Sequence, residues 1–95
     1  MKKITFIITD YGSFNNFLGD LSVKLIHNSF DITVFTSKEK VIDIKDKYDY
    51  LKLGVKFKYI NFPRNFNFFS HYKISKKIQA ELSKIKPDLV SIHFT

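Results

Sequence analysis

The chain contains no cysteine and no tryptophan, and its sixteen basic residues include a single arginine, Arg64. The absence of cysteine excludes disulfide frameworks, thiolate zinc sites and cysteine nucleophiles. It also fits a reducing compartment, so we expect a cytoplasmic protein. Proteins that read nucleic acids rely on arginine for bidentate contacts to bases and phosphates, and the near absence of arginine therefore disfavours nucleic acid as a partner.

Long apolar runs are missing as well. No stretch of the sequence approaches the roughly 18 apolar residues that a membrane-spanning helix needs. Lys2 and Lys3 precede the first apolar run, but Asp10 interrupts that run and no small-residue cleavage site comes after it. This arrangement argues against a signal peptide.

What the chain does contain is enough apolar material for one core. Its 95 residues are 44% hydrophobic and 17% aromatic, which predicts a single globular domain over residues 1–95. The net charge of +7 favours a diffuse basic surface, which suits anionic sugar phosphates or the anionic inner face of a membrane. A generally lysine-rich composition explains the same charge.

Four segments have the patterns of β-strands. Residues 4–9 form a nearly continuous run of β-branched and aromatic residues that stops at Asp10, which is typical of a strand buried on both faces. Residues 30–37 and 88–95 form two further apolar segments. Residues 55–62 alternate strictly, with Val55, Phe57, Tyr59 and Asn61 on one side, and this half-polar pattern predicts a strand near the sheet edge.

Helical periodicity comes after each of the first three strands. Behind Gly12 we expect a helix with Ser13 as its N-cap, Asn28 as its left-handed end and an inward stripe of Phe14, Phe17, Leu18, Leu21 and Leu25. Gly19 inside this helix costs about 1 kcal/mol against alanine, and a close approach of the helix to the sheet would explain it. Thr36 and Glu39 form a capping-box pattern that predicts a second helix, ended by Gly54, with Val41, Ile44, Tyr48 and Leu51 facing inward. A third helix is predicted from about Ser70 to Pro87, with an inward stripe of Tyr72, Ile74, Ile78, Leu82 and Ile85.

This order of elements, βαβαβαβ with short connections, predicts an α/β fold built on a three-layer, Rossmann-like parallel sheet. Right-handed crossovers make the first three strands neighbours. We expect the last helix to return on the opposite face, which gives the strand order 3-2-1-4. The topological switch point then lies between strands one and four, where open α/β sheets bind their ligands.

That topology nominates a site before any family is considered. The loop Asp10–Ser13 comes directly after the first strand, and His93 and Thr95 end the fourth, so all would share one crevice. Gly12 serves either a tight turn or a close approach to an anion. Asp10 either caps the turn or accepts a hydrogen bond from a sugar hydroxyl, and His93 is either a structural residue or an acid or base.

Other site chemistries find little support in the sequence. Gly12 and Gly19 do not form the dinucleotide fingerprint, and there is no Walker-type phosphate loop and no paired-histidine metal spacing. His27 and His71 fall at predicted helix ends and look structural. The phenylalanine-rich segment 62–69 either covers the sheet edge or joins Arg64 and nearby lysines in a basic, aromatic membrane patch.

Three segments carry a family resemblance: the opening KKITFIIT with its small-residue loop, the strand DITVFTS, and above all KIKPDLVSIHFT. Together they resemble the start of the amino-terminal, acceptor-side domain of a GT-B glycosyltransferase of the retaining family 4 type. The residues that match the family's fourth-strand pattern are Lys86, Pro87, Asp88, Leu89, Val90 and His93. The usual H-x-H of that strand is reduced here to Ser91-x-His93, and the first loop lacks the double glycine of many members.

The resemblance implies that the full-length protein is a hexosyltransferase of polysaccharide or glycoconjugate biosynthesis. The acceptor, a glycan or a lipid-linked sugar, would meet Asp10, Tyr11, Gly12, Ser13, Asn15 and His93, with His93 as the catalytic candidate. No metal is implied. The nucleotide-sugar donor would bind a carboxyl-terminal domain outside this sequence, so we read the chain as an inactive part of that enzyme. An exposed fourth strand would favour a homodimer, and a small non-catalytic binding or self-assembly module is the alternative.

Overall fold

The computed structural model describes residues 2–37, 46–62 and 71–93. A four-stranded parallel sheet lies at its centre, formed by β1 (Lys3–Ile8), β2 (Asp31–Thr36), β3 (Lys56–Tyr59) and β4 (Leu89–His93). Its order is β3-β2-β1-β4, as predicted, and β3 is an edge strand. The Rossmann-like arrangement of the strands is therefore confirmed.

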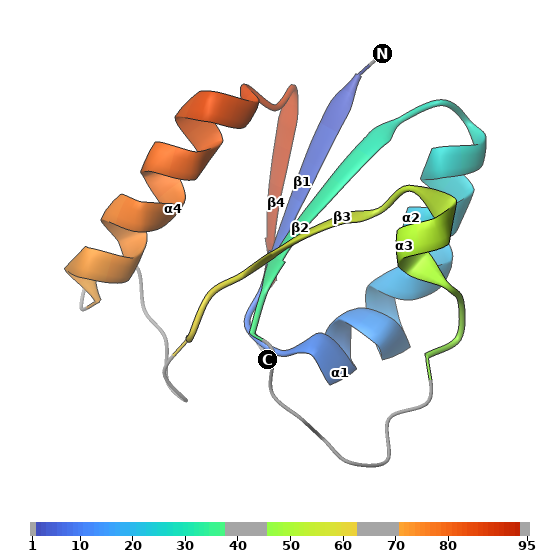
Figure 1. Ribbon diagram of the computed structural model, residues 1–95, viewed down its shortest axis with the longest axis horizontal. Coiled ribbons are helices and arrows are strands. Elements are labelled where there is room, and N and C mark those ends of the chain that lie inside the picture. The colour runs from blue at the N-terminus through green and yellow to red at the C-terminus, as the bar shows by residue number, and fades with distance from the viewer. Residues whose placement is uncertain (1, 38–45, 63–70, 94–95) are drawn as a thin grey trace.

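Helices cover both faces of this sheet (Figure 1). On one side lie α1 (Tyr11–Ser13), the π-helical turn η1 (Phe14–Leu18), α2 (Gly19–His27) and α3 (Tyr50–Leu53), and on the other side lies α4 (Tyr72–Ile85). Two apolar clusters correspond to the two faces. Around α2 the buried residues include Ile4, Phe6, Ile8, Phe14, Leu18, Ile32 and Val34; against α4 they are Ile7, Phe35, Ile60, Phe62 and Ile78.

The alternation along the strands explains these two clusters. In β1, Phe6 and Ile8 belong to one cluster and Ile7 to the other, because successive side chains of a strand point to opposite faces. After β3 the same period buries Ile60 and Phe62 on the α4 side. The alternating pattern predicted for residues 55–62 is confirmed, although the hydrogen-bonded strand covers only Lys56–Tyr59.

The first helical segment differs from its prediction in three ways. It begins at Tyr11, and Asp10 rather than Ser13 accepts the capping hydrogen bond. The π turn at Phe14–Leu18 widens one turn and so rotates the rest of the helix, which leaves Phe17 76% exposed and Leu21 also exposed. A constant helical period does not anticipate such a shift. The left-handed residue beyond the helix is Ser29, whose φ is 68°, and not Asn28.

The second predicted helix is not continuous through residues 46–53. Residues 46–49 are not helical, and α3 covers only Tyr50–Leu53 before Gly54 ends it with a φ of 105°. Asp49 caps α3 by accepting from the Lys52 amide. Tyr48 precedes this helix, and Leu51 is 70% exposed rather than inward. Glu39, Val41 and Ile44 lie outside the described residues, as do segment 63–70 and Thr95.

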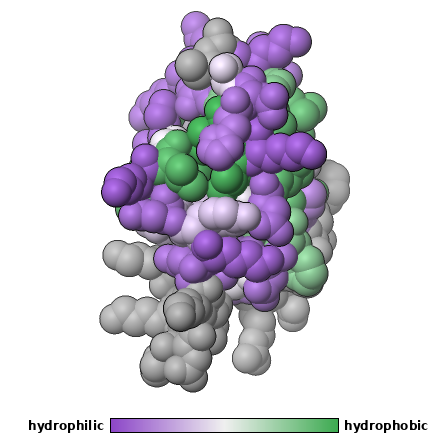
Figure 2. All heavy atoms as spheres, turned by 90° about the vertical axis from the view of Figure 1, so that its right-hand side faces the viewer, coloured by the Kyte–Doolittle hydropathy of each residue, from purple (hydrophilic) through white to green (hydrophobic). Residues whose placement is uncertain are grey.

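The packing of Tyr50 explains why a glycine occupies position 19. A β-carbon at this position would collide with the Tyr50 hydroxyl, so α2 and α3 approach closely here. The close approach was expected, but its partner is a tyrosine side chain and not the sheet. Figure 2 looks onto this side of the molecule, where apolar surface is surrounded by hydrophilic side chains. The large apolar residues that the helices of this side expose include Phe17 of η1, Leu21 of α2 and Leu51 of α3.

The last helix and strand largely match the prediction. Ile78 of α4 is fully buried, with Ile74, Leu82 and Ile85 packed against the same cluster, but Tyr72 is exposed. Lys86 takes the left-handed conformation that ends α4 just before Pro87. Within the described residues β4 pairs only with β1, and its Leu89, Val90 and Ile92 are exposed. The strand is thus an open edge.

Candidate functional site

The carboxyl ends of β1 and β4 lie side by side. In the parallel register Ile8 pairs with His93, so the loop after β1 and the end of β4 meet at one edge of the sheet (Figure 1). The chain crosses over one face of the sheet between β1 and β2 and over the opposite face, with α4, between β3 and β4. The switch point expected from the sequence is therefore present, and both candidate segments border it.

Asp10 caps the helix that begins at this edge. Its Oδ2 accepts hydrogen bonds from the Ser13 amide and from Ser13 Oγ, each at 3.0 Å. Of the two interpretations of Asp10, the capping interpretation is confirmed, and Ser13 is bound to the same carboxylate. Gly12 is a buried residue of α1, and within the described residues only Gly54 has a positive φ among glycines. The connection from β1 to α1 is short, as predicted, but the backbone of Gly12 does not require glycine through a positive φ.

Tyr11 joins the loop to a segment far along the chain. Its hydroxyl donates to Asp46 Oδ1 at 2.6 Å, and its ring contacts Phe14 and Phe57 at centroid distances of 6.0 and 5.8 Å. Burial, and after it the bond to the Asp46 carboxylate, raises the pKa of Tyr11 well above its ordinary value of 10.0. The side chain is consequently a neutral hydrogen-bond donor and not a base.

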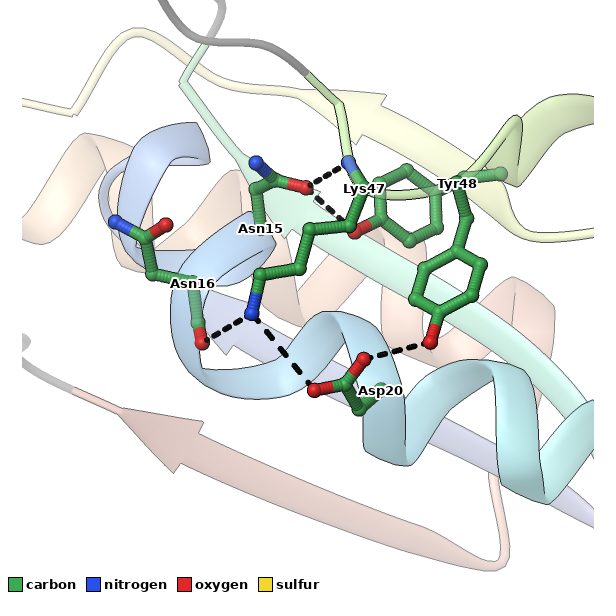
Figure 3. Close-up of polar contacts among 6 residues, drawn as sticks. Asn15, Asn16, Asp20, Lys47 and Tyr48 are labelled. Carbon is green, nitrogen blue, oxygen red and sulfur yellow. Dashed lines mark hydrogen bonds and ion pairs between the residues drawn. The ribbon is translucent and has the colours of Figure 1, made fainter.

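Asn15 is enclosed in a polar cluster between η1, α2 and residues 47–50. It is 2% exposed, and its Oδ1 accepts from the Lys47 amide at 3.0 Å and from the Tyr50 hydroxyl at 2.6 Å (Figure 3). Beside it, Lys47 Nζ contacts the Asn16 carbonyl and Asp20, as Figure 3 also shows. The structure therefore places Asn15 beneath the surface of the loop, away from direct solvent.

Asp20 completes this cluster of contacts, which we call the tyrosine clamp: Asn15, Asn16, Asp20, Lys47, Tyr48 and Tyr50. The Tyr48 hydroxyl donates to Asp20 Oδ1 at 2.7 Å. Burial above all raises the pKa of Tyr50 to about 12, with the carboxylates of Asp46 and Asp20 adding to the effect. The clamp thus joins residues 47–50 to η1 and to the start of α2.

His93 lies half-buried at the end of β4. Its Nε2 and Ser91 Oγ are 2.8 Å apart, and its ring lies 6.0 Å from that of Phe6. Ser91 and His93 are two residues apart on one strand and hence on the same face, the α2 side of the sheet. The serine thus orients the imidazole at the switch point.

Two residues at this edge were not nominated from the sequence. Asp46 holds the Tyr11 hydroxyl, and it also raises the pKa of Tyr59, for which burial is the larger cause. Tyr59, at the end of β3, is exposed and stacks on Phe57 with an interplanar angle of 6°. The alternation of residues 55–62 was the available signal for Tyr59, whereas no pattern in the sequence singled out Asp46.

Metal-ligating side chains are dispersed in the described part of the chain. Across residues 2–37, 46–62 and 71–93, no three His, Cys, Asp or Glu side chains gather as metal ligands would. In the same ranges, no helix combines the length and the apolar character needed to cross a bilayer.

The fold and this edge define the class of the protein: an open, all-parallel α/β domain with polar side chains at its switch point. Comparisons with protein-family models, with curated proteins and with solved structures found no match for the chain.

Proposed function

We propose that the chain is the acceptor-binding part of a GT-B glycosyltransferase, which moves a sugar from a nucleotide-sugar to a glycan or a lipid-linked acceptor. The observation that carries the proposal is the pairing of Ile8 with His93, which brings an oriented imidazole next to the Asp10–Ser13 loop at the switch point. The family resemblance of residues 86–93 supports the same assignment. No activity is expected from these residues alone.

The side chains at this edge suit a sugar in chemical terms. An imidazole whose Nε2 is engaged by Ser91 can offer its other ring nitrogen to an acceptor hydroxyl, as a hydrogen-bond partner or as a base. Tyr59 adds an exposed aromatic face beside the Asp46 carboxylate, and both apolar contact and hydrogen bonding are thereby offered to a ring with hydroxyl groups.

Of the six residues proposed for acceptor contact, the surroundings favour some over others. His93 is half-buried at the edge and keeps its place as the catalytic candidate. Asp10 and Ser13 form the cap of α1, with Gly12 buried between them, and this loop would meet an acceptor through its rim. Tyr11 and Asn15 act indirectly in this proposal, because their polar atoms hold Asp46 and residues 47–50 in position.

A glycan array tests the proposal with this chain alone. The labelled wild-type protein should be retained on a subset of glycans, the His93→Gln variant should lose that retention, and His27→Gln should keep it, since His27 is an exposed residue of α2. UDP-glucose, tested by calorimetry, should not bind. Retention on no glycan, or equal retention of both histidine variants, would contradict the proposal.

The open edge of β4 favours a second candidate function, a non-catalytic module that assembles with a second copy of itself. Leu89 is 56% exposed and Ile92 is 45% exposed, on a strand with one unpaired side in the described part of the chain. Such an edge is a template for pairing with another strand. Sedimentation equilibrium should then show dimers that Ile92→Lys dissociates, whereas a strict monomer at millimolar concentration would eliminate this candidate.

A further inference from the structure

A hollow of about 250 Å³ opens at the amino edge of the sheet, on the face that α4 covers. Its lining residues are Lys3, Asp31, Thr33, Lys56, Lys58 and Ile85. Lys3, Asp31 and Lys56 are the first residues of β1, β2 and β3, so the hollow lies at the end of the sheet opposite to the Asp10 loop and His93. It is independent of the proposed acceptor site.

The lining carries an excess of positive charge. Three ammonium groups and one carboxylate, that of Asp31, line the hollow. Beyond the lining, Glu81 lies 3.9 Å from Lys58 Nζ and 3.8 Å from Lys84 Nζ. The Asp88 carboxylate accepts from the Lys3 amide, so four ammonium groups are set against three carboxylates. Because opposite charges attract over several ångströms, this balance leaves the hollow attractive to an anion.

The lysines are loosely engaged in the structure. Lys3 Nζ donates to the Ile85 carbonyl at 3.2 Å, and Lys56 Nζ lies 3.4 Å from each Asp31 oxygen. Each ammonium has three donors, so these contacts leave donors for a ligand. The side chains of Lys56 and Lys58 are also more than half exposed, and ion pairs of this kind are weak. The lysines can therefore turn toward a bound anion at little cost.

We propose that this hollow binds a phosphate group. An ammonium from β1 and two from β3 would surround the phosphate, and the Thr33 side chain, which is 5% exposed, would form the floor. The volume lies just below the range of about 300–1,000 Å³ that is typical of ligands of drug size, so it suits a small phosphate monoester rather than a nucleotide. A free metabolite and a lipid headgroup both present this group.

The test is an amide-resolved NMR titration of the chain with glycerol 3-phosphate, with glycerol as the uncharged probe. We expect saturable shifts at Lys3, Thr33, Lys56 and Lys58 with glycerol 3-phosphate and none with glycerol. Lys56→Met and Lys58→Met should each weaken binding by about fivefold or more, because each removes one charge-assisted contact. Lys52→Met, which removes an equal charge from α3 on the opposite face, should weaken it by less than about twofold.

Asp31→Asn provides a test in the opposite direction. It removes the carboxylate that competes for Lys56, so it should tighten binding by about threefold or more, a gain that a misfolded variant does not produce. Asp49→Asn, on the α3 side, is the matched control and should change little. Sedimentation with vesicles that contain phosphatidic acid, whose headgroup is a phosphate monoester, then separates the sources of the phosphate.

Vesicle binding that Lys56→Met abolishes, without shifts from glycerol 3-phosphate, supports the site with a lipid headgroup as its ligand. Shifts from glycerol 3-phosphate without vesicle binding support it with a free phosphate ester. Absence of both, or equal losses in Lys52→Met and Lys56→Met, overturns the proposal in favour of a diffuse basic surface.

Discussion

Replacing Gly19 by alanine measures how closely α2 packs against Tyr50. In an exposed helix this change stabilises by about 1 kcal/mol, because alanine is the better helix former. At Gly19, however, the new β-carbon meets the Tyr50 hydroxyl, and that oxygen is held by its hydrogen bond to Asn15. Overpacking of a tight interior costs about 1–3 kcal/mol, and a collision with an oxygen held in place belongs in the upper part of that range. After the gain of about 1 kcal/mol in helix propensity is subtracted, we expect a net loss of about 1–2 kcal/mol.

Tyr50→Phe reverses that outcome because it removes the obstructing oxygen. The substitution itself should cost about 1–1.5 kcal/mol, since Asn15 Oδ1 loses one of its two donors and keeps the Lys47 amide. The nearest ring carbon is then 3.2 Å from the alanine β-carbon, a contact that a small shift relieves. In the Tyr50→Phe background, Gly19→Ala should therefore be nearly neutral, which corresponds to a coupling energy of about 1–2 kcal/mol.

Urea unfolding monitored by circular dichroism gives the four free energies of this cycle. Each kcal/mol should also move the melting temperature by about 4–8 °C in a chain of this size. Gly54→Ala is the control: nothing lies within 4 Å of its new β-carbon, but a φ of 105° strains an alanine, so its loss of about 1 kcal/mol should not depend on Tyr50→Phe. Equal effects of Gly19→Ala in both backgrounds would refute the reasoning.

Two further predictions concern the cap and the clamp. Asp10→Ala should lower the free energy of unfolding by about 1 kcal/mol, because the Ser13 amide loses its acceptor. Asp10→Asn should retain most of the wild-type stability, because an asparagine side chain also accepts at this position. Equal urea unfolding of both variants and the wild type would contradict the assignment of Asp10 as the cap. The pKa of Tyr50, raised to about 12 by burial, lies above the ordinary value of 10.0, so the folded state retains its proton longer than the unfolded state. The contribution of Tyr50 to stability is thus complete below pH 10 and is lost as the pH rises from 10 to 12. Absorbance at about 295 nm and circular dichroism should show late tyrosine ionisation together with alkaline unfolding, and titration of every tyrosine near its ordinary pKa in the folded chain would contradict it.

The sheet could be predicted from the sequence because strands are defined by local patterns. The buried run in residues 4–9, the half-polar alternation after Gly54 and the apolar segment after Pro87 each predicted a strand. The rules for parallel crossovers then predicted their order. The same reasoning brought Asp10 and His93 to one edge, because the carboxyl ends of parallel strands coincide.

The structure of residues 46–53, which include α3, could not be predicted in this way. Its structure depends on hydrogen bonds between residues far apart in sequence, such as Tyr50 to Asn15 and Tyr11 to Asp46, which no periodicity records. The π turn at Phe14–Leu18 likewise breaks the constant helical period, and it moved Phe17 and Leu21 out of the predicted inward stripe. The sequence suggested a close approach at Gly19 without naming Tyr50 as its partner.

The sequence by itself determined the four strands, their parallel order and the switch point between β1 and β4, since alternation and crossover handedness follow from local patterns in the chain. The tertiary structure alone decided which polar side chains face that edge and which are engaged beneath it. It also gathered Lys3, Lys56 and Lys58 around one hollow, because strands that lie far apart along the chain begin side by side in the sheet.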